Sequence, residues 1–210
     1  METEPTVFII DGDAENRDAL GKSISSMKVR SRAFATAEEF LDRCDGSSPG
    51  CVVLDLRLPE TDGMTGLQKL RSHRLLLPVV VVSDRGDPPT VVRAMKAGAF
   101  DFLKKPWVDE VLREAVRAAI RHDAENRKRR ARRRSVRQQI AHLSEGEREV
   151  LRSLVAGQTN REIAEELGLS VRTIEVRRAK IMRKMEAESL AHLVRLTLLG
   201  EQREERIGLD

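Results

Sequence analysis

The first half of the chain alternates short apolar runs with amphipathic segments. Unbroken apolar runs of this length predict buried strands, and the segments between them have the apolar spacing of helices. We predict strands near Thr6–Ile10, Val29–Ala33, Cys51–Leu54, Val79–Val82 and Asp101–Leu103, and helices at Ala14–Ser26, Ala37–Arg43, Thr65–Ser72 and Pro89–Ala97. This order predicts an α/β, doubly wound domain: a five-stranded parallel sheet with right-handed crossovers and helices on both faces.

Local signals mark two of these helix ends. Thr36 and Glu39 have the spacing of a capping box at the start of the second helix. Gly98 is placed to end the fourth helix in a left-handed conformation.

A fifth helix begins near Val108, where apolar residues recur at helical spacing as far as Ile120. The apolar stripe then ends and the basic run Arg127–Arg134 follows, without glycine or proline. We therefore expect the helix to continue through part of a basic helical linker, residues 122–141. Two interpretations of its arginines stay open: a solvated linker, or contacts with DNA phosphates that add a salt-sensitive term.

The last third of the chain predicts an all-α domain of four helices. Ser144 with Glu147 and Thr159 with Glu162 form two capping boxes, and Gly157 ends the first helix. Gly168 ends the second helix after about two turns, and Ser170 caps a longer third helix that runs to about Met185. A fourth helix is expected at Ser189–Leu199. A short helix, a tight glycine turn and a longer helix predict a helix-turn-helix unit.

The third helix of this domain has two different faces. At about 100° per residue, Val171, Ile174, Ile181 and Met185 share one face and are expected to point inward. The opposite face is small, polar and basic, which suits the major groove of DNA. The alternative is an ordinary amphipathic helix with a solvated face. The candidate DNA-binding residues are Arg172, Thr173, Glu175, Val176, Ala179, Lys180, Arg183 and Lys184.

Composition adds three constraints. A chain of 210 residues suits one or two domains, and a net charge of +4 is only mildly basic. Cys44 and Cys51 lack a metal-ligand spacing and are expected to be reduced thiols of a cytoplasmic protein. We expect no membrane partner, because no signal peptide opens the chain and the apolar run Leu75–Val82 is too short to span a bilayer.

Chemically active residues follow four of the predicted strands. Asp11, Asp55 and Ser83 end three apolar runs, and Lys105 lies two residues beyond a fourth. The carboxyl ends of parallel strands line one crevice, so these side chains are expected to converge. Carboxylates that hold Mg²⁺, an aspartate nucleophile, a hydroxyl and a lysine together make a phosphoryl-transfer site.

Four segments, VFIIDGD, VVLDLRLPETDG, PVVVVSDRGDP and MKAGAFDFLKKPW, resemble the receiver domain of bacterial response regulators. The resemblance covers residues 1–121, and it implies that Asp55 is the phosphoacceptor. It further implies that Lys105 grips a phosphoryl oxygen, that Ser83 moves toward the phosphate and that Phe102 is the coupled aromatic residue. The implied Mg²⁺ ligands are Asp11, Asp55 and the backbone carbonyl of Arg57.

Gly12 departs from this family pattern, which has two adjacent acids after the first strand. The missing acid normally ligates Mg²⁺, so we expect weak Mg²⁺ binding, with Asp13 as a further candidate ligand. An atypical receiver that regulates transcription without phosphorylation therefore stays open. A remote alternative is a phosphatase, because Asp11-Gly12-Asp13 also has the DxD pattern of haloacid-dehalogenase-like enzymes.

Residues 143–199 closely resemble the DNA-binding domain shared by LuxR, NarL and FixJ regulators, and the pairing with a receiver points to the FixJ branch. The similar segment is LSEGEREVLRSLVAGQTNREIAEELGLSVRTIEVRRAKIMRKM. The resemblance implies a domain over residues 142–210 and a transcription factor that is not an enzyme. It also implies a sensor histidine kinase as partner, and a homodimer that binds double-stranded promoter DNA when Asp55 is phosphorylated.

Overall fold

The computed structural model describes residues 4–44, 46–58, 63–73 and 75–201. The chain divides into two compact units, the first ending at Arg127 and the second beginning at Lys128. Residues 59–62, which carry part of the receiver-like motif, lie outside the described residues, as do residues 202–210 of the predicted C-terminal domain.

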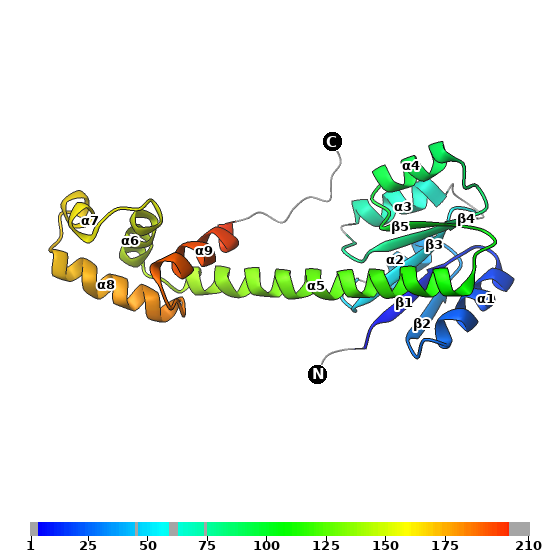
Figure 1. The fold of residues 1–210 in the computed structure, drawn as a ribbon, viewed down its shortest axis with the longest axis horizontal. Helices are drawn as coiled ribbons and strands as arrows, with labels where there is room; N and C mark the ends of the chain where they lie inside the picture. Colours follow the sequence, from blue (N-terminus) through cyan, green and yellow to red (C-terminus); the bar gives the residue numbers. More distant parts are fainter. Residues whose placement is uncertain (1–3, 45, 59–62, 74, 202–210) are drawn as a thin grey trace. The chain divides into compact units, whose positions relative to one another are not determined.

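The first unit contains a five-stranded parallel sheet, which confirms the predicted fold class. Its strand order is β2-β1-β3-β4-β5, with every neighbouring pair parallel. Helices cover both faces (Figure 1): α1 and α5 lie on one, and α2, α3 and α4 on the other. The strands are β1 (Thr6–Ile10), β2 (Arg30–Phe34), β3 (Gly50–Asp55), β4 (Val79–Ser83) and β5 (Asp101–Lys104). The helices are α1 (Ala14–Ser25), α2 (Ala37–Arg43), α3 (Gly63–Ser72), α4 (Pro88–Lys96) and α5 (Asp109–Ala141).

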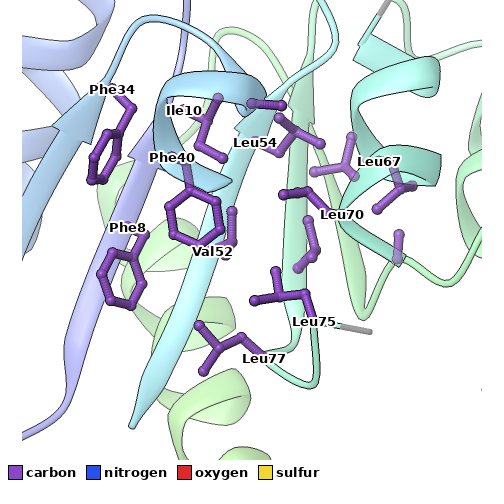
Figure 2. Close-up of a cluster of buried hydrophobic side chains, with 14 of the residues drawn as sticks. Phe8, Ile10, Phe34, Phe40, Val52, Leu54, Leu67, Leu70, Leu75 and Leu77 are labelled. Carbon is purple, nitrogen blue, oxygen red and sulfur yellow. The ribbon is translucent and has the colours of Figure 1, made fainter. Parts of the chain in front are cut away.

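Alternate residues of the strands enter two separate cores, as the two-residue period of a strand requires. On β1, Phe8 and Ile10 pack toward α2 and α3, whereas Val7 and Ile9 pack toward α1 and α5. Figure 2 shows the first of these cores. Strand β2 ends one residue later than predicted, at Phe34, and this ring lies 5.5 Å from the Phe40 ring. Strand β2 is therefore shifted by one residue from the prediction, to Arg30–Phe34, and its last residue joins the aromatic cluster of the core.

The helix ends follow local chemistry, with one difference from the prediction. Thr36 Oγ1 accepts a hydrogen bond from Glu39 N at 3.1 Å, but the Glu39 carboxylate accepts from Ala35 N rather than from Thr36 N. The predicted capping box is thus only half formed, because the glutamate bonds to the N–H one residue before the N-cap. Gly98 has φ +91°, the left-handed conformation expected after the fourth helix.

Helix α5 is 33 residues long and extends through the whole of the predicted linker. The prediction had it stop part-way; the structure shows no interruption, because no glycine or proline breaks the backbone hydrogen bonds. Its apolar face, which includes Leu112, Val116 and Ala119, packs on the sheet.

Near the end of the first unit, α5 is attached to the loop that precedes β3. Asp123 is 1% exposed, and its Oδ2 accepts from Gly50 N at 2.9 Å and from Arg127 Nε at 2.6 Å. The Arg127 guanidinium also donates to the carbonyls of Ser47 at 2.7 Å and Ser48 at 2.6 Å. We call these five residues the α5 clamp.

The second unit is a helical domain that begins with the last turns of α5. It contains α6 (Glu145–Val155), α7 (Asn160–Leu167), α8 (Val171–Lys184) and α9 (Leu190–Glu201). Both predicted capping boxes are present, at Ser144 and at Thr159. Gly168 has φ +63° and turns the chain between α7 and α8. The described part of the chain holds no helix long and apolar enough to cross a membrane.

One inward residue of α8 was predicted wrongly. Ile174, Ile181 and Met185 are fully buried, whereas Val171 is 41% exposed. Val171 is the first residue of α8, where no earlier turn of the helix covers it. The predicted inward face therefore begins at Ile174.

Candidate functional site

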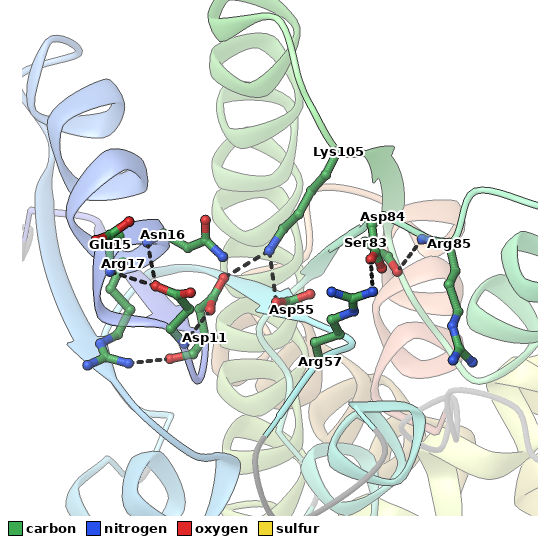
Figure 3. A network of polar contacts seen from close by, with 11 residues as sticks. Asp11, Glu15, Asn16, Arg17, Asp55, Arg57, Ser83, Asp84, Arg85 and Lys105 are labelled. Atoms are coloured by element: carbon green, nitrogen blue, oxygen red, sulfur yellow. Dashed lines mark hydrogen bonds and ion pairs between the residues drawn. The ribbon is translucent and has the colours of Figure 1, made fainter.

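Three charged residues from separate strand ends meet at the carboxyl edge of the sheet (Figure 3). Asp11 follows β1, Asp55 ends β3 and Lys105 follows β5. Lys105 Nζ lies 2.8 Å from Asp55 Oδ2 and 3.2 Å from Asp11 Oδ2. Asp55 and Asp11 are 50 and 94 positions from Lys105 in the sequence, yet the three residues form one ion-paired cluster.

This cluster carries one negative charge more than its lysine neutralises. Asp11 is 0% and Asp55 2% exposed. Burial raises the pKa of Asp11, and so does the Asp55 charge, although the Asp13 N–H and Lys105 act in the opposite direction. Burial by itself lowers the pKa of Lys105, but its bonds and charge interactions with Asp55 and Asp11 outweigh it and the net shift is upward. The second oxygen of Asp55, Oδ1, is buried and has no hydrogen-bond partner among the described residues.

The fit to a magnesium ion is partial. Mg²⁺ prefers oxygen ligands in octahedral geometry, and Asp11, Asp55 and the Arg57 carbonyl are the oxygens that the sequence assigns to it. Gly12 contributes no side chain. Asp13 Oδ1 accepts from Glu15 N at 2.8 Å and from Asn16 N at 3.3 Å, so this carboxylate caps α1. Within the described residues, no group of three or more His, Cys, Asp or Glu side chains could hold a metal ion.

Ser83 and Phe102 lie on adjacent strands beside the cluster. Ser83 is 1% exposed at the end of β4, and its Oγ accepts from Arg85 N at 3.1 Å. Ser83 O accepts from Lys105 N at 2.7 Å, so the backbones that carry the hydroxyl and the ammonium are joined directly. Phe102 pairs with Val81 in the sheet and packs, partly buried, against the core under α3 and α4.

Sequence reasoning missed three neighbours of this site. The exposed Arg57 side chain forms an ion pair with Asp84, which joins the loop after β3 to the loop after β4. Arg17 donates to the Asp11 carbonyl at 2.7 Å. The ring of Trp107, the only tryptophan in the chain, lies 5.8 Å from Lys105 Nζ. The Arg57–Asp84 pair joins two separate loops, so no spacing along the chain indicated it. The contacts of Arg17 and Trp107 are local, but they belong to no motif of the sequence.

A second candidate site is the exposed face of α8. Val176 is 42% exposed, and the seven other predicted DNA-binding residues are at least partly exposed. Glu175 pairs with Arg172 at 3.4 Å on this face. Thr173 is half-buried and bonded to Ser170 at the helix start. The exposed members are Arg172, Glu175, Val176, Ala179, Lys180, Arg183 and Lys184.

Lys184, by contrast, has an intramolecular partner. Its Nζ lies 2.6 Å from Glu147 Oε2 and 3.4 Å from the His142 carbonyl. This contact ties the end of α8 to the start of α6. The Lys184 hydrogen bond, together with the Ser144 N–H, lowers the pKa of Glu147. A DNA phosphate would have to compete with this carboxylate for the lysine.

The fold and the two sites define a class of protein in which a receiver domain is joined to a helix-turn-helix DNA-binding domain. Residues 7–117 match the response regulator receiver domain, and residues 141–197 match the luxR family of bacterial regulatory proteins. The chain therefore belongs to the response regulators with a LuxR-type DNA-binding domain, two-component proteins that regulate transcription.

Several relatives resemble the chain over nearly its whole length. The transcriptional regulatory protein FixJ of Bradyrhizobium diazoefficiens is 40% identical over 94% of this chain and 97% of its own. The response regulator protein TodT of Pseudomonas putida is 35% identical over 91% of this chain and 84% of its own.

Two solved structures are also similar. The response regulator StyR has a TM-score of 0.82 and 35% identity, over 93% of this chain and 98% of its own. Full-length FixJ from B. japonicum has a TM-score of 0.57 and 40% identity, over 94% of this chain and 98% of its own.

Proposed function

We propose that Asp55 accepts a phosphoryl group from a sensor histidine kinase, and that this modification controls DNA binding. The observation that carries the proposal is the state of the Asp55 carboxylate. Oδ2 is held by Lys105 at 2.8 Å, whereas Oδ1 is buried without a hydrogen-bond partner among the described residues. An oriented carboxylate with one uncommitted oxygen is suited to attack phosphorus, and Lys105 is placed to stabilise charge on the transferring oxygens.

Asp11, Asp55 and the Arg57 carbonyl would hold Mg²⁺ in this proposal. The ion would supply charge neutralisation to the phosphoryl oxygens. Gly12 removes one hard ligand from the set, so the proposed affinity is low. Asp13 could replace this ligand only by releasing the two backbone N–H groups that it caps. In a DxD phosphatase both aspartates would serve the reaction, whereas here Asp11 is ion-paired with Lys105 and Asp13 caps α1. These contacts favour a regulator over a phosphatase.

The output step proposed here is sequence reading by α8 in the major groove of promoter DNA. The exposed face of α8 combines arginine and lysine, which read guanine, with Val176, which can contact a thymine methyl. One helix in one groove reads few bases, so we propose a homodimer on a two-fold site. We also propose a cytoplasmic location, because the proposed DNA target and the proposed kinase reaction are both found there.

The test is phosphotransfer from acetyl phosphate to the purified chain, followed by intact mass and by binding to a promoter duplex. Wild type should gain one phosphoryl group and show stronger dimerisation in sedimentation. Asp55→Asn should do neither. Asp18→Asn, which changes an exposed acid on α1, is the matched control and should behave like wild type.

A second candidate function is transcription control without phosphorylation, and Gly12 is the observation that favours it. The same experiment separates the two candidates. If wild type and Asp55→Asn bind duplex DNA equally with and without the phosphodonor, the proposed switch at Asp55 is wrong and the phosphorylation-independent function is favoured.

A further inference from the structure

The two halves of α5 differ in how their charges are compensated. In the first half, Arg113 pairs with Glu110 at 2.9 Å and Arg121 pairs with Glu114 at 3.0 Å, so arginines have glutamate partners on the same helix. Residues 128–137, which we call the basic segment, contain seven basic residues and no acidic residue. The segment therefore cannot neutralise itself through contacts between successive turns.

Three members of the basic segment are exposed and have no ion-pair partner among the residues that the structure describes: Lys128, Arg132 and Arg134. Lys128 and Arg132 are four positions apart, so they share one face of the helix. Arg134 points about 160° away from Arg132 at the helical repeat of about 3.6 residues per turn. Ser135 and Gln139 continue the Lys128–Arg132 face with polar side chains, which can also donate hydrogen bonds.

The basic segment is held rigidly by the DNA-binding domain. Val136 is 3% exposed in the core of that domain, and Arg137 Nε donates to the Gly200 carbonyl at 2.9 Å. A Cβ atom on Gly200 would lie 3.1 Å from Val136 and from Ile140, which shows how closely α9 approaches the end of α5 (Figure 1). Arg132 is about one turn and Lys128 about two turns before Val136 on an unbroken helix. Their positions are therefore fixed relative to α8.

The end of α5 also lies near the end of α8. The His142 carbonyl, just after α5, accepts from Lys184 Nζ at 3.4 Å. Arg132 is ten residues earlier, which is about 15 Å along a helix axis. The major groove is about 12 Å wide and is bordered by phosphates. When α8 lies in the major groove, the phosphates at the groove edge are therefore about as far from the end of α8 as Arg132 is.

We infer that the Lys128–Arg132 face of α5 contacts the DNA backbone beside the bases read by α8. The inference rests on the duplex binding proposed for α8. A rigid polyanion suits this face, because its two cations have no ion-pair partner among the described residues and no large exposed hydrophobic residue of the described helix accompanies them. The contact adds a sequence-independent term to the affinity, and this term weakens as salt increases.

The experiment measures the binding of the full chain at several salt concentrations. The probes are a labelled duplex selected from a random pool by the wild-type protein, and a scrambled duplex of equal length. Arg132→Gln and Arg134→Gln form a matched pair, with the same charge change on opposite faces of one helix. Arg132→Gln should reduce the slope of log affinity against log salt by about 0.9 per protomer, and should weaken binding about fivefold near 0.15 M salt. Lys128→Gln with Arg132→Gln should double the change in slope.

Arg134→Gln is expected to retain the wild-type slope. Equal effects of Arg132→Gln and Arg134→Gln, or no effect of either, would overturn the inference. Val176→Glu separates it from the proposal on which it rests. That variant should lose the preference for the selected duplex over the scrambled duplex while keeping the salt slope. If Val176→Glu keeps this preference, the proposal that α8 reads the bases is wrong. The comparison of Arg132→Gln with Arg134→Gln would still test whether α5 contacts the DNA backbone. Circular dichroism at each salt concentration checks that the variants are folded.

Discussion

The α5 clamp makes a sharp prediction about the stability of the receiver domain. Arg127→Met keeps most of the aliphatic stem but removes the guanidinium that neutralises the buried Asp123 and donates to the carbonyls of Ser47 and Ser48. Breaking a buried ion pair by removing one partner costs about 3–5 kcal/mol. Asp123 keeps its bond from Gly50 N, and the Arg127 side chain is 29% exposed, so water replaces part of the loss. We therefore expect the free energy of unfolding to fall by about 2–4 kcal/mol.

The assay is urea unfolding followed by tryptophan fluorescence. Trp107 is the only tryptophan and packs against the core under α1 and α5, so the signal reports the receiver domain alone. Arg121→Met is the matched control on the same helix. Its side chain is 62% exposed, so its solvent-screened pair with Glu114 should contribute little to stability.

A double-variant cycle tests the cause of the effect. Asp123→Asn retains an acceptor for Gly50 N but removes the buried charge. Combined with Arg127→Met, it should destabilise the domain by less than the sum of the single changes, because the two residues act as a pair. If Arg127→Met unfolds at the same urea concentration as Arg121→Met, the clamp does not stabilise the domain and the reasoning is refuted.

Two further predictions concern the phosphorylation site and the DNA-binding domain. Gly12→Asp should tighten Mg²⁺ binding roughly tenfold or more, measured through Trp107 fluorescence, and should lower stability in the absence of metal because a third acid joins Asp11 and Asp55. Equal Mg²⁺ affinity of wild type and variant would mean that water or Asp13 already completes the site. The lowered pKa of Glu147 means that its carboxylate stabilises the fold at every pH above the pKa of an unfolded glutamate. This stabilisation is lost as the pH falls through the lower folded-state pKa. Glu147→Gln should therefore lower the thermal midpoint at pH 7 and make less difference in strong acid, and a difference that grows with acidity would contradict this.

The sequence was sufficient to predict the elements whose signals are local. Apolar runs that end at Asp11, Asp55 and Ser83 predicted the strands and the edge at which they converge. The capping boxes at Ser144 and Thr159 predicted the helix starts of the second unit. In these cases the residues that determine the element lie within the element or next to it, so no knowledge of distant contacts is needed.

Contacts between distant segments could not be predicted in this way. Lys184 lies on the polar side of α8 and was grouped with the DNA-binding residues, but Glu147, 37 positions away, holds its ammonium. Asp123 lies in a polar stretch that indicates solvent exposure, yet it is buried because a loop 73 positions away closes over it. Arg57 and Asp84 are joined for the same reason. Helical and strand periodicity specify which side a residue faces, but not which neighbour it finds there.

The α5 clamp also has a consequence for synthesis on the ribosome. One face of the sheet is covered by α5, and the loop before β3 receives hydrogen bonds from Arg127 at the carbonyls of Ser47 and Ser48. The nascent receiver therefore cannot complete its fold until residue 127 has left the exit tunnel. At about 5–20 residues per second, the chain from Lys128 to Glu201 needs roughly 4–15 s more. A receiver that folds in less time would form before the DNA-binding domain is complete. Until α9 is synthesised, the last turns of α5 would lack part of the core that buries Val136.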